Sequence, residues 1–372
     1  MRTVTRDMMV FHTRETSGAL ARVQASRTLM RGVARVLAKQ DTAYGRCLRE
    51  EAERSVSHNE YYLAHEHLAE TNRPVYFHEF VDRAAAHGLR FLTEAEYWRT
   101  AAASRPEFFQ AFGDFPLDWL GHEQLYDFLV GRAFRLSVLC HGEVSRSRTP
   151  SAQALLSLWI TTRVRPAAAG PAPSLGQRED FHDSQGALAL STNDPVVRAA
   201  LRVLAEAWPR SLAFETLWAR AQKLMASSWG IAAPSLEDAT SRARLAEAML
   251  GAFGHNIVEL HVQEPEFTTE IGEFPRASPV ARRQAATAQR VANLRHQMIA
   301  LVDCDQLVLR HLDGRHDRRA LLAALEDAVR VGGCNVPSQG RPITHPAAEQ
   351  TSLVHRLEKS LRRLANAALF VD

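Results

Sequence analysis

Apolar side chains recur at helical spacing through the first part of the chain. Between residues 18 and 56 they predict two helices, because apolar residues three or four apart form one stripe on a helix surface. Such a stripe must face a packing partner. In the first of the two helices it consists of Leu20, Val23, Leu29, Val33 and Leu37.

A histidine-rich stretch, YYLAHEHLAETNRPVYFHEF, follows at residues 61–80. It predicts a third helix that runs to about Ala69 and is interrupted by Asn72-Arg73-Pro74. Pro74 suits the first position of a fourth helix, which is expected to stop at Gly88. A short strand is expected next, at LRFL, and then helices around 94–103, 106–112 and 122–132.

The pattern changes from Phe134 onward. FRLSVLCHG (134–142) and ALLSLWITTRV (154–164) have the β-branched and large apolar character of buried strands, although periodicity alone leaves a helix open. RPAAAGPAPSLG at 165–176 is rich in Pro, Gly and Ala and is interpreted as a linker. REDFHDSQGALALS predicts a hairpin that turns at residues 183–186.

The second half opens with Asn193-Asp194-Pro195, a cap residue followed by proline at the first helical position. Three helices are expected, then two strands at NIVELHV and QMIALV, which is the order of a winged-helix unit. Two further helices close the chain, and Asp317 in the polar run 311–318 can cap the first of them. The expected ranges of the five helices are 195–207, 213–227, 235–251, 317–331 and 346–369. The last helix carries a seam of Leu353, Leu357, Leu361 and Leu364.

The expected fold class is therefore α+β and mainly α. A helical domain with a few short strands is followed by a winged-helix-like C-terminal domain with terminal helices. A length of 372 residues supports more than one domain, because it is two to three times that of a typical domain. The expected segments are N-terminal helices at 1–56, a helical domain at 57–164, the linker at 165–176 and the C-terminal domain at 177–372.

Composition and charge narrow the function classes. Only three of the 45 Lys and Arg residues are lysine, which is typical of GC-rich bacterial coding. The arginines are spread among Asp and Glu rather than clustered as a phosphate-binding surface would require. The four cysteines, far apart in the sequence, suit reduced thiols, and no signal peptide or membrane span is found, so a cytoplasmic protein is expected. These cysteines are Cys47, Cys140, Cys304 and Cys334.

The histidines raise the question of a metal site. His65 begins no zincin motif, because Ala69 occupies the place of the second histidine. His65 and His67 are two residues apart on a helix and so point to different faces. His78 and Glu79 could converge with His65 from beyond the proline, but partly buried histidines bonded to carboxylates are the favoured interpretation.

Motifs for catalysis and cofactor binding are absent from the sequence. It contains no GxSxG, GxGxxG or P-loop, and VGGCNVPSQG at 331–340 follows a helix where a phosphate loop would follow a strand. We therefore assign no catalytic, cofactor-binding or metal-binding residue. DNA binding is disfavoured, because the candidate recognition helix mixes acidic with basic residues. These are Glu237, Asp238, Glu247, Arg242 and Arg244.

Two long stretches resemble the methyltransferase regulatory domain of bacterial proteins. YYLAHEHLAETNRPVYFHEFVDRAAAHGLRFLTEAEY and YDFLVGRAFRLSVLCHGEV follow its Tyr-Leu-x-His-Glu-x-Leu, Asn-x-Pro-x-Tyr-Phe-x-x-Phe, Gly-Leu and Phe-Arg-x-x-x-Leu-Cys runs. TNDPVVRAALRVLAEAWPRSLAFETL, NLRHQMIAL and LDGRHDRRALLAAL resemble the region that follows in the same proteins, where the family has a winged-helix-like domain. The resemblance covers nearly the whole chain.

In this family the two domains usually follow a catalytic domain that binds S-adenosylmethionine, as in bacterial protein-lysine methyltransferases. The acidic-Gly-x-Gly loop of such a domain does not precede Tyr61, and RDMMVFHTRETSGALARVQASRTLM resembles the stretch just downstream of the catalytic core. The resemblance thus implies a non-catalytic regulatory or substrate-recognition portion, not an enzyme by itself and with no cofactor of its own. A stand-alone subunit, a split-gene product and a start site within a longer enzyme all stay open. A winged-helix DNA-binding regulator is the alternative function.

The implied partners are a methyltransferase catalytic domain or subunit and a protein substrate. A membrane partner is not expected, nucleic acid is disfavoured and a homodimer is left open. For partner or substrate contacts we select aromatic and charged residues of the regulatory segment, although core packing is favoured for any single one. The candidates are Tyr62, His65, Tyr76, Phe80, Arg132 and Arg135.

Overall fold

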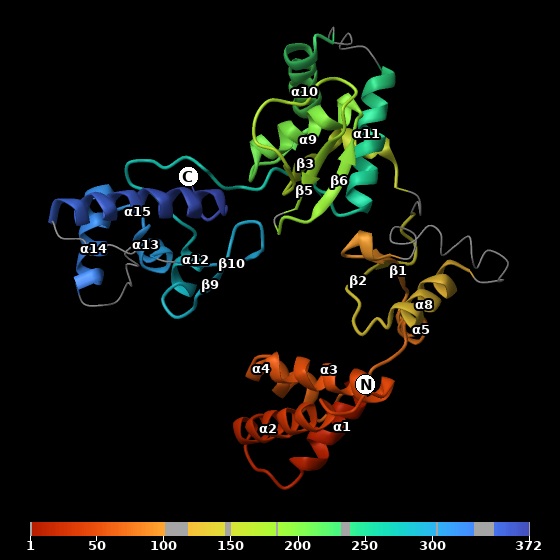
Figure 1. The fold of residues 1–372 in the computed structure, drawn as a ribbon. Helices are drawn as coiled ribbons and strands as arrows, with labels where there is room; N and C mark the ends of the chain where they lie inside the picture. The colour runs from red at the N-terminus through yellow and green to blue at the C-terminus, as the bar shows by residue number, and fades with distance from the viewer. Residues whose placement is uncertain are drawn as a thin grey trace. The chain divides into compact units, whose positions relative to one another are not determined.

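A computed structural model gives the architecture of the chain, which divides into two compact units, Met1–His87 and Gly88–Asp372. Helices predominate, and the strands of the described residues form two two-stranded and two three-stranded sheets (Figure 1). The α+β, mainly α class is therefore confirmed, whereas the boundaries of the four expected segments stay a prediction. No helix in the described part of the chain has the length and apolar character needed to cross a membrane. The structure describes residues 2–100, 118–145, 150–183, 185–231, 239–302, 304–330 and 346–371.

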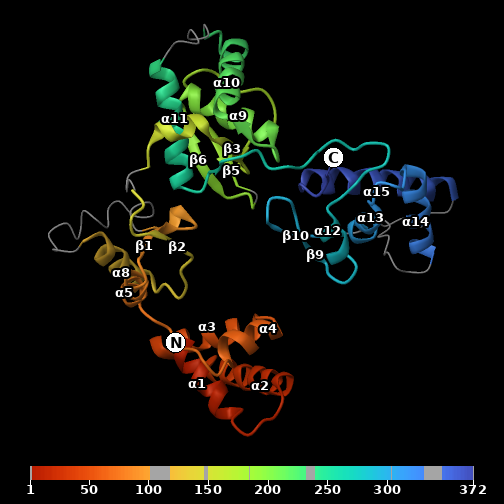
Figure 2. The ribbon, with the colours of Figure 1, turned by 180° about the vertical axis from the view of Figure 1, so that it is seen from behind.

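Three helices build the core of the first unit, and Figure 2 shows them packed together. α2 and α3 confirm the two helices expected between residues 18 and 56, while α1 is a helix that the apolar pattern did not predict. Met9, Val23 and Met30 are buried in the shared core. Leu20, expected in the buried stripe, is exposed, because the core closes around residues further along α2. The bounds are α1 Arg2–His12, α2 Ala19–Leu37 and α3 Ala43–Ser57.

The histidine-rich stretch folds as one α-helical turn, α4 (Glu60–Tyr62), that continues as a π-helix, η1 (Leu63–His67). Asn59 caps the start, where its side-chain oxygen accepts a hydrogen bond from the Tyr62 backbone N–H at 2.8 Å. The backbone N–H of Leu68 donates to the Leu63 carbonyl, five residues earlier, at 3.0 Å. The third helix is therefore confirmed in position, but its second half has the wider π turn that often marks functional sites.

The fourth helix, α5 (Phe77–Ala86), begins three residues later than the sequence predicts, so Pro74 is not its first residue. The reason lies at the cap: the Tyr76 backbone N–H donates to Glu79 Oε2 at 3.0 Å, which satisfies a donor at the helix start. The predicted stop is confirmed. Gly88 adopts a φ of 71°, which a residue with a side chain rarely takes.

A two-stranded antiparallel sheet opens the second unit. β1 (Leu89–Glu94) confirms the strand expected at LRFL, and β2 (Ser137–His141) confirms the one expected in FRLSVLCHG. The pairing joins Leu89 to His141 and Glu94 to Ser137. It brings the carboxylate of Glu94 to the start of β2, where the site described below is built.

Helical predictions around this sheet have mixed outcomes. The helix expected at 94–103 is wrong over its described part, because Glu94 ends β1 and Tyr97–Arg99 form a single 3₁₀ turn, η2. α8 (Trp119–Val130) confirms the helix expected at 122–132, with the Asp118 carboxylate accepting from the Gly121 N–H at 2.8 Å. The helix expected at 106–112 lies outside the described residues.

Two three-stranded sheets and three helices enclose the middle core of the second unit (Figure 1). β3 lies between β7 and β8, and β5 lies between β4 and β6. Ile160, Leu201, Phe214 and Trp218 are buried between these layers. The bounds are η3 Ala152–Ser157, β3 Trp159–Thr162, β4 Arg165–Pro166, β5 Glu179–His182, β6 Leu188–Thr192, α9 Pro195–Ala207, β7 Leu212–Ala213, α10 Phe214–Trp229, α11 Ala239–Gly254 and β8 Val258–His261.

The hairpin of β5 and β6 is confirmed, as is the start of α9, where Asp194 Oδ1 accepts from the Val196 N–H at 2.9 Å. The winged-helix order placed in this region is wrong. The strand in NIVELHV is β8, and it pairs with β3 because Val258 completes the core built there, whereas the strand in QMIALV pairs with another partner. The helix taken as a DNA-recognition helix, α11, buries Leu245 and Met249 in the same core.

The expected linker at 165–176 is held against α9 rather than lying free. Arg198 is fully buried, and its Nη2 donates to the Pro173 carbonyl at 2.6 Å and its Nη1 to the Ser174 carbonyl at 3.2 Å. Its guanidinium lies 4.5 Å from the ring centroid of Trp229, whose Nε1 also donates to Pro173, at 2.8 Å. Glu179, at 3.2 Å from Arg198 Nε, balances the buried charge.

Arg198→Met should free this segment. We expect the free energy of unfolding to fall by about 2–3 kcal/mol, because two carbonyls and a carboxylate lose a charged donor, and cleavage within 165–176 by a protease to become faster. Arg244→Met is the control, because Arg244 is exposed and, among the described residues, pairs only with Asp194, at 2.6 Å. Equal protease sensitivity of the two variants would contradict this role of Arg198.

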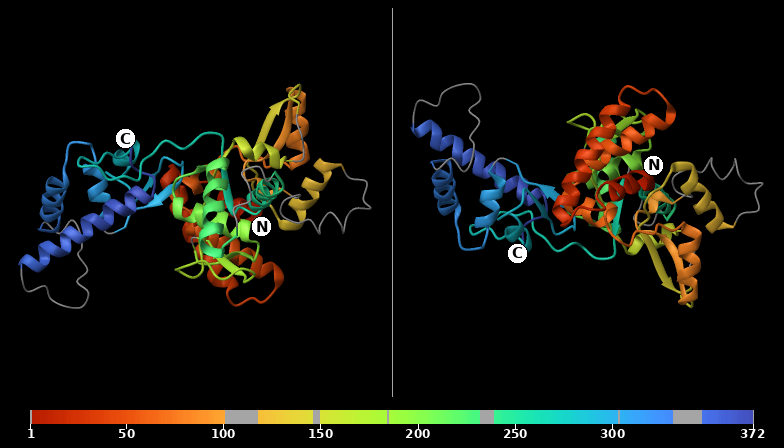
Figure 3. Two further views of the ribbon diagram at one scale, coloured as in Figure 1. Left: turned by 90° about the horizontal axis from the view of Figure 1, so that it is seen from above. Right: turned by 90° about the horizontal axis from the view of Figure 1, so that it is seen from below.

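The C-terminal part of the second unit is a separate helical core with one hairpin. Figure 3 shows α15 alongside α13 and α14, with which it is in contact. The predicted leucine seam is confirmed, since Leu353, Leu357, Leu361 and Leu364 are all buried. The predicted cap is confirmed too, because Asp317 Oδ1 accepts from the Ala320 N–H at 2.7 Å. The bounds are α12 Pro279–Gln284, β9 Arg290–Ala292, β10 Met298–Ala300, α13 Asp305–His311, α14 Arg318–Arg330 and α15 Pro346–Asn366.

The turn between β9 and β10 carries Arg295 into the middle core. Its guanidinium lies 4.7 Å from the Trp208 ring centroid, its Nη1 donates to the Pro209 carbonyl at 2.8 Å, and its Nη2 pairs with Glu259. Burial opposes the charge of Glu259, but His261, Arg295 and Arg163 outweigh it and lower the pKa of Glu259 to about 2. This arginine therefore joins the β9–β10 hairpin to the middle core.

Candidate functional site

The six candidate contact residues fall in both units. Tyr62, His65, Tyr76 and Phe80 belong to the first unit, and Arg132 and Arg135 to the second. Tyr62 belongs to a polar centre of the first unit, and Arg132 and Arg135 belong to a polar centre of the second. Their role as partner or substrate contacts stays a prediction.

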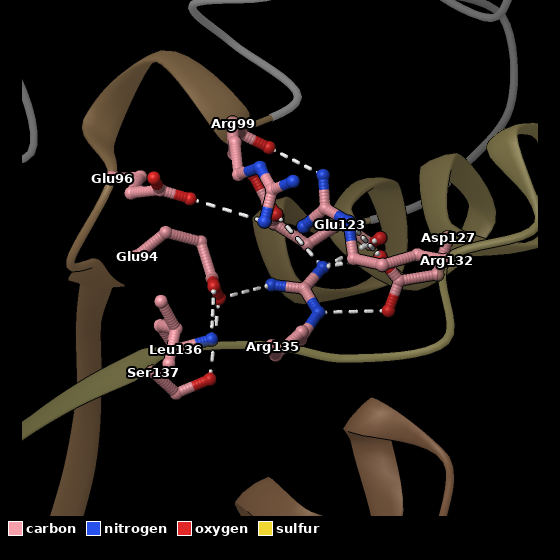
Figure 4. A network of polar contacts seen from close by, with 9 residues as sticks. All are labelled: Glu94, Glu96, Arg99, Glu123, Asp127, Arg132, Arg135, Leu136 and Ser137. Atoms are coloured by element: carbon pink, nitrogen blue, oxygen red, sulfur yellow. Dashed lines mark hydrogen bonds and ion pairs between the residues drawn. The ribbon is translucent and has the colours of Figure 1, made fainter. Parts of the chain in front are cut away.

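Arg135 is the centre of a buried ionic network in the second unit (Figure 4). Its Nη1 donates to Glu94 Oε1 at 2.6 Å, its Nε to Asp127 Oδ2 at 2.7 Å, and its Nη2 to Glu123 Oε2 at 2.9 Å. Nη2 also donates to the Glu123 carbonyl at 3.0 Å. One guanidinium thus ties the end of β1 to α8 and to the start of β2.

Two of the three carboxylates of this network are inaccessible to solvent. The side chain of Glu94 is 2% exposed and that of Glu123 is 0% exposed. Glu94 Oε2 accepts from the Leu136 backbone N–H at 2.9 Å, so both of its oxygens are used. Burial opposes the charge of Arg135, but the hydrogen bonds and charges of Asp127 and Glu123 outweigh burial and raise the pKa of Arg135.

Arg132 extends the network on the α8 side. Its Nε lies 3.3 Å from Asp127 Oδ1, its Nη2 donates to the Arg99 carbonyl, and its guanidinium is 5.4 Å from the Tyr126 ring centroid. The Nη1 of Arg132 is buried without a hydrogen-bond partner among the described residues. The two arginines offset two of the three carboxylates, and the network positions a backbone junction rather than presenting a reactive group.

The polar centre of the first unit lies between α1, α3 and the π-helix. Arg2 Nη2 donates to the Tyr62 hydroxyl, and Arg2 Nε lies 3.6 Å from the buried Glu51. The Tyr62 ring centroid is 4.0 Å from that of His58 and 5.9 Å from that of His67. Tyr62 therefore stands at the centre of an aromatic and ionic cluster.

His67 is the buried member of this cluster. It is 3% exposed, and its Nε2 has no hydrogen-bond partner within the described part of the chain. Burial, and then the charge of Arg2, lower the pKa of His67 to about 4, so the ring is neutral near neutral pH. Burial and the charge of Arg2 lower the pKa of His58 as well. The divergence expected between His65 and His67 is confirmed, because His65 is exposed.

The remaining candidates have simpler surroundings. Tyr76 is exposed, and its ring stacks on that of His78 with centroids 5.9 Å apart. Phe80 is half-buried on α5. Among the described residues, no three His, Cys, Asp or Glu side chains group as metal ligands. Cys47, Cys140 and Cys304 are free thiols, and Cys334 lies outside the described residues.

Sequence reasoning missed most partners of these centres. Glu123 and Asp127 form an i, i+4 carboxylate pair in an otherwise largely apolar helix, a pattern that signals a buried cation partner. Glu51 interrupts the apolar face of α3 between Leu48 and Ala52, which is a similar signal. Arg2 had no comparable signal, because its helix was itself not predicted.

Two family models match separate segments of the chain. Residues 59–141 match the predicted methyltransferase regulatory domain. This range includes Tyr62 and Arg135, the central residues of the two polar centres. Residues 273–369 match the C-terminal winged helix domain of PKMT. The winged helix region is thus the part with α12 to α15 and the β9–β10 hairpin.

Two proteins of Rickettsia prowazekii resemble the chain. An uncharacterized protein of Rickettsia prowazekii is 24% identical over 98% of this chain, which spans 66% of that protein. A second uncharacterized protein of the same organism is 32% identical over 92 residues. These residues are 25% of this chain and 37% of that protein. The chain thus spans about two thirds or less of the curated relatives it matches.

Solved structures share the fold. The structure of PKMT2 from Rickettsia typhi superposes on 100% of this chain with a TM-score of 0.82 and 22% identity, and the chain covers 72% of it. The structure of PKMT2 in complex with AdoHcy gives a TM-score of 0.82, with 23% identity and the same coverage. Two segments of the chain therefore match a methyltransferase regulatory domain and the PKMT C-terminal winged helix domain, and the chain as a whole shares the fold of the PKMT2 structures.

Proposed function

We propose that this chain is the non-catalytic regulatory or substrate-recognition portion of an S-adenosylmethionine-dependent methyltransferase that modifies protein lysines. It neither binds the cofactor nor transfers the methyl group by itself. Its partners are a methyltransferase catalytic domain or subunit and the protein that is methylated.

The pair of family matches, at 59–141 and 273–369, carries this proposal. The chain corresponds to 72% of PKMT2, whose structure has been determined with AdoHcy, so PKMT2 has a further portion outside the alignment. We place cofactor binding in that portion. The sequence of this chain supports the division, because it lacks the Gly-rich loop after a strand with which doubly wound domains hold such cofactors.

The polar centres fit a recognition role. The Arg135 donors are directed at carboxylates of the same unit, and His67 is buried and neutral. A general base or nucleophile needs an accessible group that can reach a substrate. Rigid positioning of the helices and the β1–β2 sheet is what these contacts provide.

Titration calorimetry on the full chain tests cofactor binding. We expect no saturable heat with S-adenosylmethionine or S-adenosylhomocysteine, and PKMT2, whose structure with AdoHcy is known, serves as the positive control. Micromolar binding by this chain would refute the non-catalytic assignment. A labelled methyl donor incubated with the purified chain and a lysine-containing protein should also give no transfer.

A second measurement tests the partnership. The tagged chain, recovered from its native host under mild conditions, should bring with it S-adenosylmethionine-dependent methyl transfer that the recombinant chain lacks. Recovery of the chain without such activity would argue against a catalytic partner, whatever the calorimetry gives.

A further inference from the structure

The first unit contains an apolar groove that neither polar centre uses. It has a volume of about 480 Å³ and is formed mainly by α1 and α2, with one residue from α3. His12 and Thr28 are its polar members. The apolar lining consists of Met8, Leu29, Gly32, Val33, Val36, Leu37 and Leu48. A concave apolar surface of this size is typical of ligand or partner sites.

Gly32 is unexplained by the fold itself. It lies within α2, its φ is not in the left-handed region, and a Cβ added there would meet no atom within 4 Å. A glycine inside a helix costs about 1 kcal/mol relative to alanine. Neither backbone conformation nor crowding therefore requires a glycine here, and its missing side chain leaves the groove open beside α2.

Large apolar side chains at the groove are left in solvent. Val36, on the lining, is 65% exposed, and Phe11, next to His12, is 68% exposed. Val4, Met8 and Phe11 follow helical spacing on α1, which gives a second apolar stripe beside the core residue Met9. Exposed apolar side chains beside an apolar groove favour an interaction site here.

The charge that α2 contributes beside the groove has one sign. α2, Ala19–Leu37, contains four arginines and no Asp or Glu. Arg31 and Arg35 are exposed and lie three positions after the lining residues Thr28 and Gly32, hence on the adjoining face of the helix. Neither has an ion pair with another described residue, in contrast to Arg27, which lies 3.4 Å from Glu60. Charge complementarity with these unpaired arginines therefore favours a ligand that carries carboxylates beside its apolar surface.

We propose that the groove between α1 and α2 docks an acidic amphipathic helix of a partner protein. Its apolar face fills the groove over Gly32, and its carboxylates pair with Arg31 and Arg35. A helix is the occupant that suits an apolar groove bordered by two helices and lined by Gly32, because its anchors recur at i, i+3, i+4 and i+7. This docking site does not depend on the methyltransferase assignment, since its chemistry is that of the groove alone.

The test measures binding of a labelled synthetic peptide to the full chain by fluorescence anisotropy. The peptide is a helix with leucines at i, i+3, i+4 and i+7 and glutamates between them. We expect saturable binding that weakens at high salt. A peptide with lysines in place of the glutamates should bind about tenfold more weakly or not at all.

Gly32→Leu blocks the groove without threatening the fold, because open space receives the side chain and the helix gains propensity. We expect a loss of at least about tenfold in peptide affinity with unchanged or raised thermal stability. Gly251→Leu is the matched control: Gly251 lies in α11, is exposed, and likewise has nothing within 4 Å of an added Cβ. It should leave peptide binding unchanged.

Arg31→Glu combined with Arg35→Glu separates charge from shape. We expect about tenfold weaker binding of the glutamate peptide and recovery of binding by the lysine peptide. Binding to phosphatidylglycerol vesicles is measured as well, because a basic apolar face is also suited to an anionic lipid surface. The proposal would be overturned if the chain bound no peptide but bound vesicles, and Gly32→Leu abolished that vesicle binding. It would also be overturned if Gly32→Leu left the peptide affinity unchanged.

Discussion

Arg135→Gln is expected to lower the free energy of unfolding of the second unit by about 3–5 kcal/mol, the range typical when one member of a buried ionic network is removed. Glu94, Glu123 and Asp127 would lose their shared cation. Glu94 and Glu123 cannot turn to solvent, so they must either be protonated or open the sheet. The largest single effect on stability is therefore expected here.

Urea unfolding followed by tryptophan fluorescence measures this loss, since all six tryptophans lie in the second unit. Arg99→Gln is the control, because the Arg99–Glu96 pair, 3.0 Å apart, is half exposed and its loss should cost less than about 1 kcal/mol. A double-mutant cycle of Arg135→Gln with Glu123→Gln should give a coupling free energy above about 1 kcal/mol. Additive effects would contradict the network as described.

Acidification below pH 6.5 is expected to destabilise the first unit. The folded-state pKa of His67 is about 4, depressed mainly by burial, while the unfolded value is 6.5. Between pH 6.5 and 4, His67 is protonated in the unfolded chain but stays neutral in the folded chain. The free energy of unfolding is therefore highest above pH 6.5 and falls as the pH approaches 4. The shift sets an upper limit of about 3 kcal/mol on this loss.

Hydrogen exchange in α2 and α3 measures the effect, because the first unit contains no tryptophan. His67→Leu removes the titrating group, so its stability relative to the wild type should rise as the pH is lowered from 8 to 5. His65→Leu is the matched control, since His65 is exposed on the same π-helix and should leave the pH profile unchanged. Parallel profiles for wild type and His67→Leu would show that His67 does not control this response.

Local signals account for much of the fold. Asp194 followed by Pro195 correctly marks the start of α9, and the leucine seam of α15 correctly marks its buried face. These predictions succeed because caps and helical periodicity act within a few residues. The predicted start of α5 at Pro74 is wrong because a second local signal competes with it. The Glu79 side chain accepts from the Tyr76 backbone N–H, and this cap outweighs the preference of Pro74 for a first helical position.

Predictions that depend on distant pairing succeed less often. Periodicity identifies β8 and β10 as strands but not their partners, because each strand finds its neighbour through the core that it helps to close. The candidate site shows the same limit. Arg135 is recognisable as an unusual residue, yet its partners Glu94 and Glu123 lie 41 and 12 positions away along the chain.

Residue order alone therefore establishes a mainly helical α+β chain with a regulatory-domain signature at the histidine-rich stretch. The environment of each polar group comes from tertiary packing. Burial makes His67 neutral and surrounds Arg135 with carboxylates, while Gly32 stays open between α1 and α2. The physical reason is that hydrophobic periodicity is a property of neighbouring residues, whereas desolvation and charge pairing depend on which distant segments meet.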